Sequence, residues 1–222
     1  RYVAPRREVR LRPGAGGHLK HQPLISIVIP TIGERAHWLE ECIEGYSKTN
    51  GSIHTQLIVI KDRATCAIAW NEGIAQAEGS YIHLTADDIV PHEGWWVAAI
   101  EASSQGYIPS PLILNSDGST QSCGNGANRV PDGTRAEICR IPWGPKKLFE
   151  QIGRVPEDMH YYTDNWFSWA ARQTGAADTR VKQGYLFTHH LAPERREMAD
   201  ERLWDDGVKF QQYTRRQGRR RA

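Results

Sequence analysis

The sequence of 222 residues lacks any apolar run of the roughly 18 residues that a membrane-spanning helix requires. It also shows no secretory leader, in which a basic start, an apolar stretch and a small-residue cleavage site follow one another. Its hydrophobic content of 39% and charged content of 24% are ordinary for a globular domain. We therefore expect no transmembrane helix, and either one substantial core or one domain with extensions.

Cysteine is scarce, and its spacing excludes the common zinc modules. Four cysteines stand alone, without a C-x-x-C pair, at Cys42, Cys66, Cys123 and Cys139. Disulfides and reduced thiols both remain open. We favour reduced thiols and therefore expect a cytoplasmic protein.

Charge of either sign is unevenly distributed along the chain. Residues 1–20 carry a charge of +5, and residues 213–222 carry five arginines and no acid. Because the whole chain is only +2, the part between them is acidic. The basic ends are either solubilising and disordered or bind an anionic partner such as nucleic acid or a membrane surface.

The first half of the sequence alternates between strand and helix patterns. Runs of apolar, β-branched residues predict strands. Two segments lie between these runs and predict helices, one from apolar residues at helical spacing and the other from a glycine at its end. The strands are expected at 24–30, 56–61 and 81–85, and the helices at 35–48 and 66–77. This β-α-β-α-β order predicts an α/β fold, a single Rossmann-like domain with a mostly parallel central sheet flanked by helices.

The second half is less regular and contains proline-interrupted stretches. Its expected elements are helices at 95–104, 146–153, 164–175 and 193–212, and strands at 106–114 and 184–190. We therefore divide the chain into a flexible basic segment, a domain and an arginine-rich tail. Their respective ranges are 1–20, 21–212 and 213–222.

Two adjacent carboxylates, Asp87 and Asp88, follow the third predicted strand. In an open parallel sheet, ligands bind beyond the carboxyl ends of the strands. Two neighbouring carboxylates repel each other unless a cation or solvent lies between them, and oxygen ligands suit Mg²⁺ or Mn²⁺ together with substrate phosphates. The pair by itself is consistent either with a metal–diphosphate site or with a solvated turn.

Three segments around these acids resemble the family-2 glycosyltransferases, which have the GT-A fold. ISIVIPTIGERAHWLEECIEGY resembles the opening strand, turn and helix of that family, and LIVIKD resembles its second strand. AWNEGIAQAEGSYIHLTADD matches, in spacing as well as residue type, the segment that leads into the D-x-D-type metal motif. The resemblance covers roughly residues 24–190 and is strongest over 25–96.

The resemblance implies roles for six residues in binding a nucleotide-sugar. Thr31 and Glu34 would lie against the nucleotide, Asp62 would accept a hydrogen bond from the base, and Asn71 would line the diphosphate side. Asp87 would contact ribose or metal, and Asp88 would bind the metal. The family often has arginine before the asparagine and a second acid before the base-reading acid, whereas this chain has Trp70 and Lys61.

The resemblance also implies a catalytic base. YTDNWFSWAARQTG is similar to the family segment that opens a helix with the base, which places Asp164 in that role. An aspartate at a helix start is also a common capping residue. We expect Trp166 to contribute to the acceptor wall.

A histidine pair ends the last predicted strand, where the family often supplies a metal ligand. Alignment favours His189, and His190 should point to the opposite face because side chains alternate along a strand. The alternative is that both histidines are structural.

The leading hypothesis is a metal-dependent inverting glycosyltransferase that uses Mn²⁺ or Mg²⁺ and takes a hexose from a UDP-sugar. The acceptor is open among glycan, protein, lipid carrier and nucleic acid. One alternative is an inactive module of the same fold whose basic ends bind nucleic acid or an anionic surface. Another is a transferase that acts on nucleic acid. Nucleotidyl transfer is disfavoured because TIGER (31–35) has neither a glycine-rich phosphate loop nor a lysine.

Overall fold

The computed structural model describes most of the chain, with internal gaps. The described residues are 24–121, 135–136, 138–175, 178–190 and 196–221. The basic segment 1–20 and Cys123 lie outside them. The other three cysteines are free thiols, two of them fully buried. No helix within the described ranges is both long enough and apolar enough to cross a membrane.

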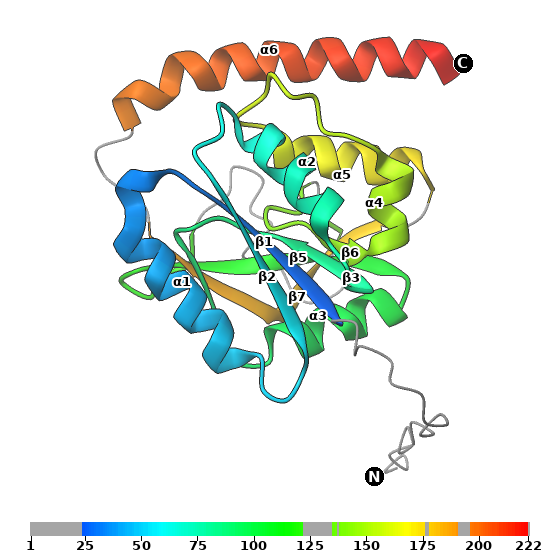
Figure 1. Ribbon diagram of the computed structural model, residues 1–222. Helices are drawn as coiled ribbons and strands as arrows, with labels where there is room; N and C mark the ends of the chain where they lie inside the picture. Colours follow the sequence, from blue (N-terminus) through cyan, green and yellow to red (C-terminus); the bar gives the residue numbers. More distant parts are fainter. Residues whose placement is uncertain (1–23, 122–134, 137, 176–177, 191–195, 222) are drawn as a thin grey trace.

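A four-stranded sheet forms from the first half of the chain and one later strand (Figure 1). Its order is β2-β1-β3-β6. The strands β1, β2 and β3 are parallel to one another, and β6 runs antiparallel to β3. Their bounds are Ile25–Thr31 for β1, Thr55–Lys61 for β2, Tyr81–Leu84 for β3 and Trp143–Pro145 for β6. The predicted alternation of strands and helices is confirmed.

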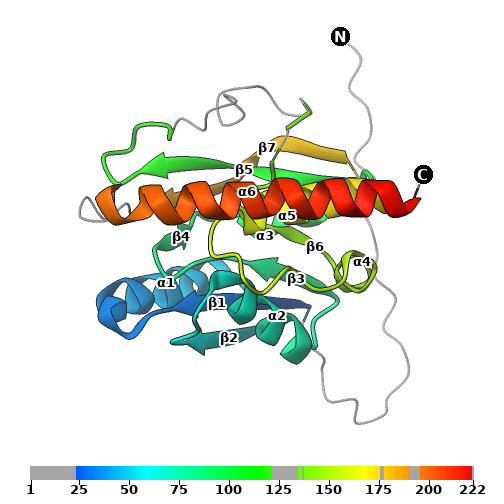
Figure 2. The same cartoon turned by 90° about the horizontal axis from the view of Figure 1, so that it is seen from above.

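A second sheet of three strands has the order β4-β7-β5. It joins β4 (Ile89–Pro91), β7 (Asp178–His189) and β5 (Tyr107–Asn115), with β4 antiparallel and β5 parallel to β7. Figure 2 shows the two sheets as separate layers. The expectation of an α/β, Rossmann-like domain is confirmed, although two mixed sheets replace one central sheet.

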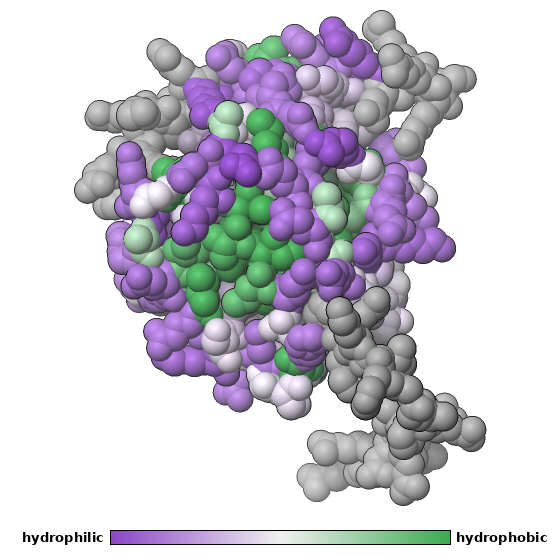
Figure 3. Space-filling model, viewed as in Figure 1, coloured by the Kyte–Doolittle hydropathy of each residue, from purple (hydrophilic) through white to green (hydrophobic). Residues whose placement is uncertain are grey.

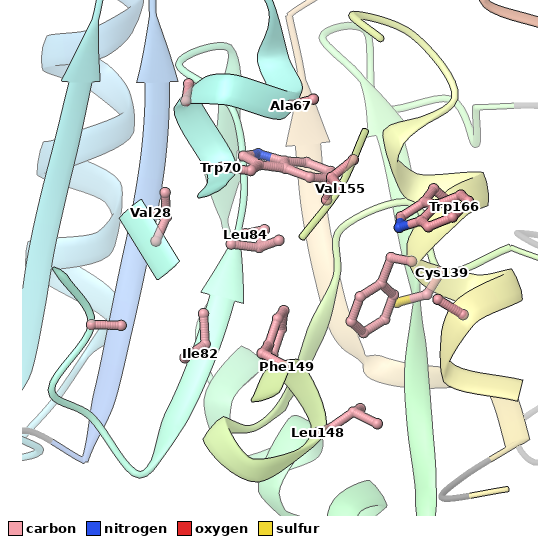
Figure 4. Close-up of a cluster of buried hydrophobic side chains, with 14 of the residues drawn as sticks. Val28, Ala67, Trp70, Ile82, Leu84, Cys139, Leu148, Phe149, Val155 and Trp166 are labelled. Atoms are coloured by element: carbon pink, nitrogen blue, oxygen red, sulfur yellow. The ribbon is translucent and has the colours of Figure 1, made fainter. Parts of the chain in front are cut away.

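Helices cover both faces of the four-stranded sheet. The helices are α1 (Ala36–Thr49), α2 (Cys66–Gln76), α3 (Trp95–Ser104), α4 (Lys146–Ile152) and α5 (Thr163–Gln173). Successive residues of β1 serve different cores: Val28 packs with side chains of α2, α4 and α5, and its neighbours Ile27 and Ile29 pack with side chains of α1, α3 and β7. Figure 4 shows the first of these cores. The alternation follows from the two-residue period of a strand.

Close packing against β1 explains why two positions shortly before β3 are glycine. A Cβ on Gly73 would lie 2.1 Å from Val28 Cγ1, and one on Gly79 would lie 2.5 Å from the backbone nitrogen of Ser26. Both positions therefore require glycine, because α2 and the following turn approach β1 closely. This close packing holds α2 and the turn before β3 against β1, the strand with which β3 pairs.

The last helix, α6 (Arg196–Arg221), is longer than the sequence predicts. It was expected to end near residue 212, but it continues through most of the arginine-rich segment. The views in Figures 1 and 2 place it across the domain, next to the loop that precedes α5.

The face seen in Figure 3 carries an apolar area framed by hydrophilic residues. It lies over the paired strands β1 and β2, between α1 and α2 (Figures 1 and 3). β2 is an edge strand, and its residues Leu57 and Val59 are only half-buried.

Candidate active site

Polar side chains gather where β1 and β3 end. Thr31 is the last residue of β1, and Asp87 follows β3 by three positions. The hydroxyl of Thr31 donates a hydrogen bond of 2.7 Å to Asp87 Oδ2 in a buried setting. The parallel pairing of β1 with β3 brings these residues together from positions 56 apart in sequence.

Arg35 lies between the two carboxylates. Its Nη1 donates to Asp87 Oδ1 at 3.1 Å and to Asp88 Oδ2 at 2.8 Å. The guanidinium also packs over Trp38, at 5.1 Å from the ring centre. Sequence reasoning missed Arg35, which ends the short 3-10 helix Gly33–Arg35. The repulsion between the acids is therefore relieved by a cation from within the chain.

The pairing of β4 with β7 brings the late histidines to these acids. Ile89 faces His189 in the register, and His189 Nε2 lies 3.7 Å from Asp88 Oδ2. Its Nδ1 contacts the side-chain amide of Gln121, whose oxygen accepts a hydrogen bond of 3.0 Å from Arg140. A partner at Nδ1 orients the ring, so that Nε2 faces the carboxylate.

His190 points elsewhere, as alternation along a strand requires. Its Nε2 lies 3.2 Å from Glu41 Oε1, and its Nδ1 contacts the hydroxyl of Ser116. The structure therefore places His189, and not His190, beside the acids.

The two neighbouring acids differ in their pKa values. Burial raises the pKa of Asp87, and the charge of Asp88 adds to this, although Thr31 and Arg35 oppose both effects. Burial also tends to raise the pKa of Asp88, but the contacts with His189 and Arg35 outweigh this effect and lower the pKa. The shared guanidinium and the imidazole therefore favour the ionised form of Asp88 more than that of Asp87.

Two adjoining cavities open at this point. The Arg35 cavity, of about 350 Å³, is lined by Thr31, Arg35, Arg63, Thr65 and Asp87 among others. The Asp164 cavity, of about 280 Å³, is lined by Asp164, Thr85, Gln121, Arg140 and Tyr162 among others. Both cavities share the same central residues, which are Cys66, Ala86, Asp88, His160, Tyr161 and His189. The result is a two-part site with Asp88 and His189 at the junction.

Asp164 lies at the start of α5, half-buried in the wall of its cavity. Burial raises its pKa; the backbone N–H of Asn165, 2.8 Å from Oδ1, and the charge of Arg140 offset this only in part. A carboxylate with a raised pKa accepts a proton more readily than an ordinary aspartate does.

The structure places three predicted residues outside both cavities. Glu34 is exposed, and Asp62 accepts a hydrogen bond of 2.8 Å from the backbone nitrogen of Gly33. Asn71 is buried. Its side-chain amide donates a hydrogen bond of 2.8 Å to the carbonyl oxygen of Val155 and accepts one of 2.9 Å from the backbone nitrogen of the same residue. Asn71 joins α2 to the segment before α5.

The loop before α5 supplies wall residues to both cavities and is held by α6. The carboxylate of Asp206, a buried residue, accepts hydrogen bonds from the backbone nitrogens of His160 and Tyr161 at 2.7 and 2.9 Å. Lys209 Nζ bonds Asp206 as well, and Phe210 stacks on Tyr162. Sequence reasoning missed this arrangement, since the polar pattern of α6 gave no sign of a docked face.

Trp166 was expected in the acceptor wall, and that expectation is corrected here. It is 2% exposed and packs in the core against Trp169 and Tyr213. The helical spacing of α5 turns Trp166 inward, away from the cavity that Asp164 lines.

Asp88 and His189 are the residues that could hold a divalent cation at this point. Among the described residues, no group of three His, Cys, Asp or Glu side chains is placed to hold a metal ion. Two protein ligands suffice where substrate phosphates complete the shell, as is common for Mg²⁺. The carboxylate oxygen of Asp88 and the imidazole Nε2 of His189 converge at the cavity junction and suit such an ion.

Comparisons with known proteins identify the fold. No protein-family model and no curated protein matches the sequence. Among solved structures, S. aureus TarS matches at 12% identity with a TM-score of 0.56, covering 77% of this chain and 37% of TarS. The TarS 1–349 fragment in complex with UDP matches at 12% identity with a TM-score of 0.55, covering 77% of this chain and 61% of the fragment.

These matches show a glycosyltransferase-like fold. At 12% identity they show the fold alone. The chain spans less than two thirds of either TarS chain.

Proposed function

We propose that the protein is a metal-dependent inverting glycosyltransferase that moves a hexose from a UDP-sugar to an acceptor hydroxyl. The observation that carries the proposal is the meeting of two cavities at Asp88 and His189. One cavity is lined by arginine and threonine side chains beside the two acids, and the other holds a carboxylate with a raised pKa. The first cavity would hold a diphosphate, and the second would supply the proton acceptor.

The donor would occupy the Arg35 cavity. Arg35 and Arg63 offer guanidinium groups, and Thr31 and Thr65 offer hydroxyls, which are common partners of a diphosphate. The fold-level likeness to TarS, which was solved with UDP, supports a uridine nucleotide as the donor. Asp62 and Glu34 would reach only the outer, nucleoside end of such a donor, because both lie outside the cavity.

The acceptor would occupy the Asp164 cavity. The acceptor oxygen forms the new bond to the anomeric carbon while Asp164 takes the hydroxyl proton. The bond from that carbon to the diphosphate breaks on the opposite face, and UDP leaves with the electron pair. A divalent cation held by Asp88 and His189 would supply positive charge to the leaving diphosphate.

Nucleotide-dependent thermal stabilisation tests the proposal. UDP, GDP, dTDP and CMP are each added with and without Mn²⁺ to the wild-type protein, to Asp88→Asn and to the control Asp205→Asn, an exposed acid on α6. UDP with Mn²⁺ at 100 times its dissociation constant should add about 2.7 kcal/mol of stability to the wild type and the control. Asp88→Asn should lose this gain. Absence of a response to all four nucleotides would refute the donor site.

The course of α6 favours a second candidate, a transferase or inactive module that binds nucleic acid. Five arginines lie in the last two turns of a continuous helix, and Arg215 and Arg216 are exposed. Phosphate contacts by arginine weaken steeply with salt. Binding to nucleic acid that is unaffected by removal of residues 213–222 would eliminate the end of α6 as the binding site, and absence of binding at low salt would eliminate this candidate.

A further inference from the structure

One cation from the chain already occupies the position that a metal ion would need. Arg35 Nη1 contacts Asp88 Oδ2 at 2.8 Å, and this is the same oxygen that lies 3.7 Å from His189 Nε2. The guanidinium is charged at every accessible pH. The side chain of Arg35 is only 15% exposed, so this ion pair is largely removed from solvent.

A divalent ion at Asp88 and His189 would compete with Arg35 for that oxygen. Two positive groups cannot share one carboxylate oxygen without strong repulsion at a short distance. Arg35 therefore weakens metal binding for as long as it stays between the acids. Its contact with the face of Trp38 helps to keep it there.

The adjoining cavity provides another partner for the same guanidinium. Arg35 lines the Arg35 cavity as well as contacting the acids. A diphosphate in that cavity would present anionic oxygens, and arginine binds phosphate in a bidentate manner. A bound nucleotide can thus draw Arg35 away from Asp88.

We propose that Arg35 is an exchangeable counter-ion, which makes uptake of the divalent cation depend on prior or simultaneous binding of a nucleoside diphosphate. This inference rests on the proposed function, because it requires the donor in the Arg35 cavity. Linkage then demands reciprocity: UDP raises the affinity for Mn²⁺ by the factor by which Mn²⁺ raises the affinity for UDP.

Direct titration of Mn²⁺ tests the inference without any turnover assay. Free Mn²⁺ is followed by its electron paramagnetic resonance signal, with and without saturating UDP. The proteins are wild type, Arg35→Gln, Arg35→Lys, Arg35→Met and a matched control, Arg180→Gln. Arg180 is an exposed arginine that pairs with Asp178 and lines neither cavity.

Without UDP, Arg35→Gln should bind Mn²⁺ at least about tenfold more tightly than wild type, a difference of about 1.4 kcal/mol. Arg180→Gln should bind it as weakly as wild type does. Arg35→Lys keeps a positive charge and should also stay weak. Arg35→Met removes the charge but keeps an unbranched side chain, should bind as tightly as Arg35→Gln, and serves as the second variant if Arg35→Gln does not fold. The enhancement of Mn²⁺ binding by UDP should shrink in Arg35→Gln.

Equal Mn²⁺ affinities for Arg35→Gln and wild type would overturn the inference. If the protein still bound Mn²⁺ in the presence of UDP, and this binding required Asp88, the proposed function would stand without the inference about Arg35. If UDP bound but no protein took up Mn²⁺ in its presence, both the inference and the metal dependence would fail. Arg35 would then be the permanent cation of the site.

Discussion

The two cavities differ in how their carboxylates are neutralised. In the Arg35 cavity, Asp87 and Asp88 share a guanidinium and have further polar partners. In the Asp164 cavity, Asp164 has only backbone N–H contacts and the more remote charge of Arg140, and burial raises its pKa. The first arrangement suits binding of charge, and the second suits acceptance of a proton. Four predictions follow from this contrast.

Asp164→Asn should show the largest effect. Loss of a general base costs about 10²- to 10⁴-fold in turnover. Affinity for UDP with Mn²⁺, measured by calorimetry, should stay within about twofold because Asp164 does not line the Arg35 cavity. Asp117→Asn, in an exposed turn, serves as the control. Turnover within about tenfold of the wild type would show that Asp164 is not the general base, and the functional difference between the two cavities would then be unsupported.

Asp206→Ala should affect both cavities at once. Its carboxylate holds the nitrogens of His160 and Tyr161, which line both. Since hydrogen bonds to charged groups contribute about 1.5–3 kcal/mol each, we expect a loss of about 3 kcal/mol in the free energy of unfolding.

The KM values for donor and acceptor should rise together in Asp206→Ala. Asp205→Ala changes the neighbouring exposed acid and should leave unfolding and both constants unchanged. A rise in only one KM would mean that the loop belongs functionally to a single cavity.

Replacement of Asp88 by asparagine should destabilise the fold at pH 7, whereas the same replacement of Asp164 should not. The pKa of Asp88 is lowered, so its ionised form stabilises the fold, and this contribution is lost as the pH falls through its folded pKa. The pKa of Asp164 is raised, so ionisation at neutral pH opposes folding. Urea unfolding should show a loss of about 1 kcal/mol for Asp88→Asn and no loss, or a gain, for Asp164→Asn. Equal losses would contradict the contrast.

Arg140→Gln should have the smallest effect, a shift in the pH dependence of turnover. Arg140 partly offsets the raised pKa of Asp164, so its removal should raise that pKa further. The acidic limb of the kcat profile, where the base becomes protonated, should then move to higher pH by less than one unit. Arg172→Gln, outside both cavities, is the control. An unchanged limb would mean that another group controls it.

The sequence predicted the parts of the fold that depend on local periodicity. The strands and helices of the first half are strongly patterned, and the glycine spacing before β3 follows from the close approach of Gly73 and Gly79 to β1. β4 was not predicted, because a strand of three residues is too short to show a hydrophobic alternation. It is nevertheless the strand that aligns His189 with Asp88.

Other parts of the site depend on the partner that each side chain finds in three dimensions. Asn71 was predicted to line the diphosphate side, yet its amide pairs with the backbone of Val155, 84 residues away. Arg35 and Asp206 gave no signal because a charged residue near a turn or on a polar helix is usually solvated. Nothing local in the sequence distinguishes such residues from those that neutralise or organise a site.

The attachment of α6 has a consequence for biosynthesis. His160 and Tyr161 owe their backbone hydrogen bonds to Asp206, which follows His160 by 46 positions in the chain. A ribosome therefore completes both sheets before it produces the residue that fixes this loop. The nascent chain therefore contains Asp87, Asp88 and Asp164 before it contains the residue that fixes this wall of both cavities. The order of the elements makes α6 the last part of the site to be synthesised.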